Sequence, residues 1–296
     1  MNHYPQIYLL PYRGVFRLRW RIFQWVILIV LLGWLYFPIL SRLVRQWFDD
    51  PDYSHGFLVP AFSIFMLWRE RSHLSRLTAK PSAWGLLILV MAESMLIVGV
   101  LGAELFLSRI SLLFVMAGLV VFFFGWQCFR SIFFPWAFLF LMVPIPAILM
   151  TRVTFPLQIL ASTVAGSTLP LMGVPVLREG NIINLPAMSL EVAEACSGIH
   201  SLLSLITLAI IYGFLTERRT HLRFVLALAS IPIAVAANSL RIVITGLVAQ
   251  YWDPSKAQGF FHEFSGWLLF LISLAVLVAL HRFLRLGEVR SSVGQL

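Results

Sequence analysis

Long apolar segments dominate the chain and are separated by short polar stretches. Several of these segments have about 18 or more residues, which is enough for a helix to cross the roughly 30 Å core of a bilayer. They lack the alternation of barrel strands, and backbone polar groups in lipid must pair within the segment. The pattern therefore predicts an all-α fold, a polytopic membrane helix bundle with about eight transmembrane helices. The expected spans are residues 22–40, 57–68, 84–101, 110–126, 132–150, 196–215, 224–248 and 264–281.

The apolar pattern loosens between residues 151 and 195. Residues 155–172 are apolar but contain Pro156 and Pro170, so a span, a re-entrant hairpin and a helix lying on the surface all remain open. Residues 173–188 carry further Pro and Gly and are expected to form a loop that does not cross the membrane.

The positions of the charges predict the orientation. Short cytoplasmic loops collect Lys and Arg, so the side that holds most of the 22 basic residues is assigned to the cytoplasm. Most of the 13 acidic residues then lie on the outer side. This partition requires eight spans, both termini in the cytoplasm, and residues 155–172 not crossing. The segments assigned to the cytoplasm are the N-terminus, residues 69–80, Arg130, residues 216–223 and the C-terminal tail.

The composition agrees with a membrane protein. The chain has 296 residues, of which 60% are hydrophobic and 12% are charged, whereas about a quarter of a soluble domain is charged. The net charge of +9 is explained by basic cytoplasmic loops, and no basic stripe lies on a soluble domain, so nucleic-acid binding is not expected. Residues 1–296 are treated as one integral membrane domain.

A cysteine, two carboxylates and a histidine lie close together in residues 191–204, where an apolar span begins. The unpaired amides and the dipole of a helix N-terminus stabilise a thiolate, which makes Cys196 a candidate nucleophile. The alternative is a buried cysteine that packs as a small hydrophobic residue. Cys128 is expected on the opposite side of the membrane, so a disulfide is not expected.

Arg241 lies inside a long apolar span. A buried charge there costs several kcal/mol and normally faces a partner or a polar cavity. Arg241 is about 26 Å along the helix from Phe224, at the outer level of the membrane. Asn238 precedes it by three residues and lies on the same helix face. The alternative is a structural arginine that reaches the headgroups or pairs with a glutamate.

His262 ends the last outer loop, where a histidine can exchange protons near neutral pH. Its alternative role is to cap the last span. His55 and His200 are rival candidates, and Glu194 is a candidate to orient a histidine or to hold an arginine. No His-x-x-x-His or Cys-x-x-Cys spacing supports a metal site, so neither a metal nor another cofactor is expected.

Four segments of this chain resemble the exosortase/archaeosortase family. They are Asp52–Pro60, Glu194–Ile199, Asn238–Arg241 and the loop from Gly259 to His262, and their order and spacing match over about residues 45–275. The resemblance implies a cysteine enzyme with about eight spans that recognises C-terminal sorting signals of PEP-CTERM type and cleaves or transfers the protein. It maps the catalytic set onto Cys196, Arg241 and His262. At His200, relatives commonly have an arginine instead.

The resemblance also implies the partner and the location. The partner would be a membrane-anchored exported protein, and the enzyme would lie in a bacterial inner membrane with its site facing the periplasm. A link with exopolysaccharide production is implied as well. The oligomeric state is left open.

Two other classes of function remain as alternatives. A transporter or flippase for envelope polymers would use Arg241, Glu93 and Glu104 along its pathway, with a broken helix at Pro144 and Pro146. A structural subunit of an export complex would tolerate replacement of Cys196.

Overall fold

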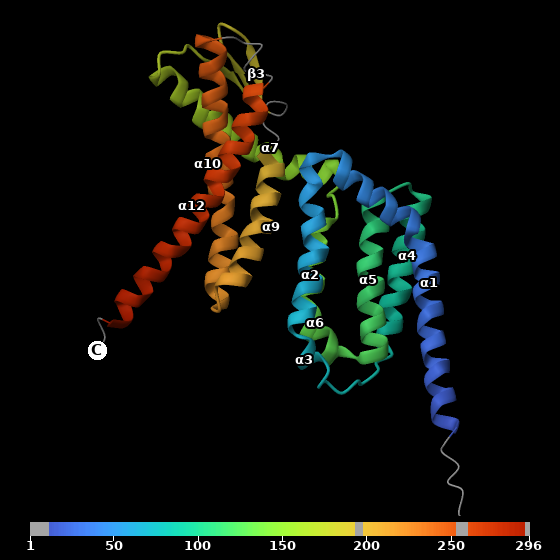
Figure 1. The fold of residues 1–296 in the computed structure, drawn as a ribbon. Coiled ribbons are helices and arrows are strands. Elements are labelled where there is room, and N and C mark those ends of the chain that lie inside the picture. Colours follow the sequence, from blue (N-terminus) through green and yellow to red (C-terminus); the bar gives the residue numbers. More distant parts are fainter. Residues whose placement is uncertain (1–11, 193–197, 253–259, 294–296) are drawn as a thin grey trace, which may run out of the picture.

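The computed structural model describes the backbone of residues 12–192, 198–252 and 260–293, and these residues are mostly helical (Figure 1). The helices form two groups, with α7 leading from the first to the second. The first group comprises α1 (Tyr12–Asp49), the 3-10 helix η1 (Pro51–Phe57), α2 (Leu58–Arg69), α3 (Arg71–Leu74), α4 (Trp84–Leu101), α5 (Leu105–Phe124), α6 (Trp126–Phe138) and the 3-10 helix η2 (Leu139–Met142). The second comprises α7 (Ala147–Leu171), β1 (Leu177–Glu179), β2 (Ile182–Asn184), β3 (Ser189–Glu191), α9 (Gly198–Thr216), α10 (Thr220–Tyr251) and α12 (Phe260–Val293).

The first group is held together by a buried apolar cluster that also receives α9. Leu43, Phe62 and Phe138 are buried in this cluster, and Phe214 of α9 packs against it. Trp47 Nε1 donates a hydrogen bond to the carbonyl of Met142 at 3.1 Å, so the end of α1 is tied to η2. The two groups therefore share a packed interface along α9.

In the second group, α9, α10 and α12 pack lengthwise against one another. Leu205 and Ala234 are buried together with Phe270 packed against them, and one step further along, Ala209 and Leu226 are buried with Leu277. This order makes α9 and α12 parallel and α10 antiparallel to both. The starts of α9 and α12 and the end of α10 therefore lie at the same end of the three-helix unit (Figure 1).

A three-stranded antiparallel sheet covers that end, in the order β1-β2-β3. Gly180 has a φ of +65° in the two-residue turn between β1 and β2, a conformation that favours glycine. Ile183 and Leu190 are buried against Ala165 of α7 and Ile242 of α10. The sequence analysis assigned this region to a loop and the fold to all-α, because strands of three residues are too short to show a period of two.

The expected helix positions are partly correct. The expected span 84–101 coincides with α4, and α10 and α12 contain the expected spans 224–248 and 264–281. The single span expected at 132–150 is wrong: the α-helix ends at Phe138, and α7 begins only at Ala147, after Pro144 and Pro146. Each proline removes a backbone donor and disfavours a helical residue before it, which explains the break.

Residues 155–171 belong to α7, which is one continuous helix from Ala147 to Leu171 with Met172 as its C-cap, so the re-entrant hairpin is excluded. Among the described residues, six helices are long and apolar enough to cross a membrane, and α7 is one of them. The first of these, α1, continues to Asp49, beyond the end expected at residue 40, while α2 has only 12 residues. The expected count of eight spans is therefore not confirmed.

A buried carboxylate fastens the far end of the three-helix unit. Glu217 lies between α9 and α10, and its Oε1 accepts hydrogen bonds from the backbone amides of Arg218 and Arg219, at 2.7 and 3.1 Å. Its Oε2 lies 3.1 Å from Nε of Arg285 and 3.3 Å from Nε2 of His281, both in α12. The backbone amide of Arg219 lowers the pKa of Glu217 most, followed by His281, Arg285 and the amide of Arg218, and the pKa falls to about 2 although burial opposes the shift.

Replacing Glu217 with glutamine should lower the melting temperature of the detergent-solubilised protein, because the ion pairs to α12 are lost. Removing one partner of a fully buried ion pair costs about 3–5 kcal/mol, and we expect a loss below that range because Arg285 is half exposed. The pKa of this carboxyl is lowered in the folded state, so its contribution is complete above the ordinary value of 4.5 and fades as the pH falls toward 2.

The difference between wild type and Glu217→Gln should therefore shrink when melting is measured at pH 3 in place of pH 7. The exposed carboxylate Glu70 provides the matched control, and Glu70→Gln should melt like the wild type. Equal melting temperatures for Glu217→Gln and the wild type at pH 7 would contradict this account.

Candidate active site

Arg241 belongs to α10, and its side chain lies against α12. The residue is only 8% exposed. Its guanidinium lies directly against Gly266 of α12. A Cβ added to Gly266 would be 3.0 Å from Nη2 and 3.1 Å from Cζ of Arg241. The missing side chain at residue 266 therefore makes room for the guanidinium where the two helices meet.

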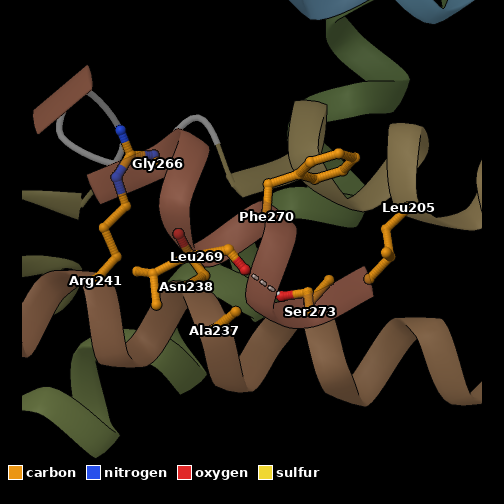
Figure 2. A pocket seen from close by; sticks show the side chains of 9 residues that line it. Leu205, Ala237, Asn238, Arg241, Gly266, Leu269, Phe270 and Ser273 are labelled. Atoms are coloured by element: carbon orange, nitrogen blue, oxygen red, sulfur yellow. Dashed lines mark hydrogen bonds between the residues drawn. The ribbon is translucent and has the colours of Figure 1, made fainter. Parts of the chain in front are cut away.

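Arg241 and Gly266 line a small pocket of about 20 Å³, enough for about one water molecule (Figure 2). The pocket lies between α9, α10 and α12. Its remaining lining residues are Leu205, Ala234, Ala237, Asn238, Leu269, Phe270 and Ser273. Ser273 donates a hydrogen bond of 2.7 Å to the carbonyl of Leu269, so this hydroxyl is already used within α12. Arg241 and Asn238 are the polar residues of α10 in an otherwise apolar lining.

Asn238 has a buried acceptor in this pocket. Within the part of the chain that the structure describes, Oδ1 of Asn238 has no hydrogen-bond partner. Burying an amide oxygen without a hydrogen-bond partner costs about 1–3 kcal/mol of folding free energy. Such a position is typical of a group that meets a ligand or a water. The expectation that Asn238 and Arg241 share a helix face is confirmed, since both side chains line the same pocket.

The structure places the other expected site residues less completely. Cys196 and Glu194 lie outside the described residues. His200 and His262 lie in the first turns of α9 and α12, and their side chains are not among those described. His262 precedes Gly266 by one helical turn, and Cys196 precedes the first residue of α9 by two positions.

The helix register relates these positions to one another. Leu205 of α9 and Phe270 of α12 pack in the same cluster. His262 precedes Phe270 by eight residues, which is about 12 Å of helix, and Gly198 precedes Leu205 by seven, which is about 10 Å. The start of α9 and His262 therefore lie at similar levels of the unit, on the side of the pocket where Arg241 meets Gly266.

His55 occupies a different place from the Arg241 pocket. It lies in η1, is 6% exposed, and its Nδ1 is 3.3 Å from Oγ of Ser204 in α9. Ser204 follows the start of α9 by six residues, or about 9 Å. In the structure, His55 thus contributes a contact between the first group of helices and α9, and it does not line the pocket.

Sequence reasoning missed three residues near these sites. The role of Gly266 depends on which residue of α10 it meets, and Ser204 gives no signal as a partner of His55. Arg109 lies in α5 and is 4% exposed.

The residues of the transporter alternative do not meet in one pocket. Arg241 lines the pocket of the second group, whereas Glu93 lies in α4, and Glu104 caps α5 by accepting a 2.8 Å hydrogen bond from the amide of Leu107. The helix break at Pro144 and Pro146 is present, but among the described residues it is not joined to a path of charged side chains.

The fold and the pocket define a polytopic helical membrane protein with a polar site near one end of three packed helices. A family model of the transmembrane exosortases matches residues 47–279, so the chain belongs to this family. Members are membrane enzymes of the cysteine transpeptidase or protease type that act on proteins carrying a sorting signal. No curated protein and no solved structure matches the chain.

Gly266→Ala should displace the guanidinium of Arg241 by a few tenths of an ångström, because the new Cβ would lie 3.0 Å from Nη2. Small displacements of a positioned group lower rates strongly, and we expect processing of a sorting-signal protein to fall about 10-fold or more. The melting temperature should stay the same or rise, since alanine is the better helix former.

Gly33 of α1 provides the control, because a Cβ there would meet nothing within 4 Å. Gly33→Ala should process the same protein at the wild-type rate. Full activity in Gly266→Ala would show that the position of this guanidinium does not matter for the reaction.

Proposed function

We propose that this protein is a membrane cysteine peptidase or transpeptidase that cleaves C-terminal sorting signals, of PEP-CTERM type, from exported proteins. The observation that carries the proposal is the buried guanidinium of Arg241 against Gly266, one helical turn from His262. Family membership supplies the reaction class. A link with exopolysaccharide production belongs to the same proposal and rests on the resemblance alone.

Cys196 acts as the nucleophile. Its thiolate attacks the carbonyl carbon of the scissile peptide bond, the C–N bond breaks, and a thioester forms between the substrate and Sγ. In the sequence, Cys196 precedes the first residue of α9 by two positions, and the amides of a helix N-terminus favour a thiolate.

His262 transfers the protons. It gives a proton to the amine that leaves, and it then takes one from the water or amine that attacks the thioester. Attack by water makes the enzyme a protease, whereas attack by an amine makes it a transpeptidase. In either case the Cys196 thiolate is the second leaving group and returns to its starting state.

Arg241 stabilises the negative charge that develops on the substrate oxygen. A guanidinium held in a poorly hydrated pocket interacts strongly with such an oxyanion and needs little reorganisation during the step. Oδ1 of Asn238 is available to accept an N–H of the bound substrate in the same pocket. His55, His200 and Glu194 take supporting roles near the start of α9.

We propose that the sheet end of the three-helix unit faces the periplasm and that both termini are cytoplasmic. The basic segment that includes α3 and the basic turn between α9 and α10 lie at the opposite end from the sheet, and this distribution of charge is typical of the cytoplasmic side (Figure 1). The start of α1 and the end of α12 lie at that same basic end (Figure 1).

The nucleophile is tested by co-expression with an exported protein that carries a PEP-CTERM signal and is tagged before its terminal helix. The wild type should convert it to a smaller form on an immunoblot, and Cys196→Ala should abolish the conversion. Arg241→Ala should slow it by about 10²–10³-fold, the usual effect of losing an oxyanion donor. His262→Ala should slow it by about 10²–10⁴-fold.

Leu240→Ala is the control, because Leu240 is exposed beside Arg241, and its variant should process normally. Unchanged conversion by Cys196→Ala would eliminate the proposed nucleophile. Conversion that depends on Cys196 but not on Arg241 or His262 would leave the cysteine and overturn the other two roles.

The orientation is tested with single cysteines placed on exposed residues at the two ends, in a chain whose own cysteines are replaced. A membrane-impermeant maleimide should label Glu179→Cys, in the sheet, from outside intact spheroplasts. Ser72→Cys, in α3 of the basic segment, should react only after the membrane is opened. The reverse pattern would rule out a periplasmic site.

A further inference from the structure

Strand β3 forms one edge of the sheet, and its backbone groups alternate between the ladder and the open side. In the pairing with β2, the amide of Val192 donates to Asn181 and the amide of Leu185 donates to Met188. With Ile183 opposite Leu190, these are the hydrogen-bonded pairs of an antiparallel ladder. The N–H and C=O groups of Ser189 and Glu191 therefore point away from β2, toward the open edge.

Within the described residues this edge is unpaired, and the outer face of the strand is exposed. The side chains of Ser189 and Glu191 are exposed, while Leu190 between them is 3% exposed and anchors the strand in the core. Among the described residues, no strand pairs with β3 on its open side. Exposed edges of this kind accept an additional strand, because main-chain donors and acceptors are already aligned.

The edge lies close to the proposed reaction site in both sequence and space. Ile242 and Val243, the next two residues after Arg241, pack in the same core cluster as Leu190 and Val192. The sheet therefore rests on α10 at the level of Arg241. Along the chain, β3 ends at Glu191, five residues before Cys196. A peptide paired with β3 would therefore lie at the level of Arg241.

We propose that the open edge of β3 binds the extended segment of the substrate as a fourth strand, at the point where that segment leaves the substrate's membrane helix. This inference rests on the proposed function and names the surface that holds the scissile peptide. Backbone pairing is independent of side chains, so one edge suits many exported proteins, and alternate side chains of the bound strand are left free for recognition.

The small size of the edge fits an enzyme that must release its product. Ser189 and Glu191 offer two donors and two acceptors, and each hydrogen bond formed changes an equilibrium constant by about two- to tenfold. Such an edge binds weakly alone. The substrate's apolar helix, held in the same bilayer, would supply the remaining affinity by raising the effective concentration of the segment.

A proline substitution can test the hydrogen bonds of the open edge without changing those that pair β3 with β2. Glu191→Pro removes an N–H that points to the open side and leaves the pairing with β2 intact, as proline does on edge strands. Processing of the tagged sorting-signal protein should be about 5–10-fold slower in Glu191→Pro than in Glu191→Ala, which keeps the N–H but lacks the same side chain. The larger effect should fall on KM rather than on kcat.

The opposite edge gives the matched control. Arg178 is the residue of β1 whose N–H points outward there, because its partner Ile183 pairs with β3 instead. Arg178→Pro should process within about twofold of the wild type. Alkylation of Cys196 by a small maleimide should proceed normally in Glu191→Pro, which excludes damage to the nucleophile. Equal processing by Glu191→Pro and Glu191→Ala would overturn the proposal.

Disulfide trapping tests the geometry directly. In a chain with Cys196→Ala and Cys128→Ser, Glu191→Cys is combined with single cysteines along the substrate segment before its terminal helix. Strand pairing predicts crosslinks at every second substrate position, because alternate side chains share one face. Crosslinks at every third or fourth position, crosslinks between two enzyme chains only, or no crosslinks would each reject it.

Different results would contradict the proposed function and the strand-pairing inference. If Cys196→Ala still processes the substrate, the proposed function is wrong, whatever the crosslinks show. If Cys196→Ala is inactive and the crosslinks lack the period of two, only the strand-pairing inference is lost.

Discussion

A guanidinium buried between apolar helices requires a neighbour without a side chain, and the contact of Arg241 with Gly266 meets this requirement. The rest of the second group depends on it. The contact fixes the register of α10 against α12 at the level where His262 lies one turn away. It also leaves the charge facing a pocket with one other polar group of α10, Asn238. In lipid such a charge is expensive, so its retention is most simply explained by function.

The two ends of the three-helix unit hold that register in different ways. At the basic end, Glu217 joins the turn between α9 and α10 to α12 through charged hydrogen bonds. At the other end, the sheet is anchored by apolar contacts between Leu190, α7 and α10. The basic end, which Glu217 joins to α12, lies far from the proposed chemistry. The sheet end combines a packed underside with an exposed edge, as a surface that receives a peptide would need.

The sequence predicted those features that depend on local pattern. The limits of α4 coincide with the expected span, because its run is apolar apart from Glu93 and Ser94 and polar residues flank it. Arg241 and Asn238 were expected together, because a charge in an apolar span is conspicuous and a spacing of three fixes the face. Pro144 and Pro146 were noted as an interruption, but not as the end of one helix and the start of another.

Features that depend on tertiary contacts could not be predicted. Gly266 is one of 18 glycines, and only the crossing of α10 and α12 reveals what it admits. The three short strands have no period of their own and are stabilised by the core that α7 and α10 build beneath them. The burial of Arg109 in α5 likewise depends on the helices that pack around it.

The central claim is that Cys196 carries the substrate as a thioester, and trapping this intermediate tests it most directly. The enzyme, isolated from cells that process a sorting-signal protein, would be digested and examined by mass spectrometry with and without hydroxylamine. The account predicts a substrate fragment attached to Sγ of Cys196 that hydroxylamine removes. A substrate fragment covalently attached at any other residue of an active enzyme would contradict it.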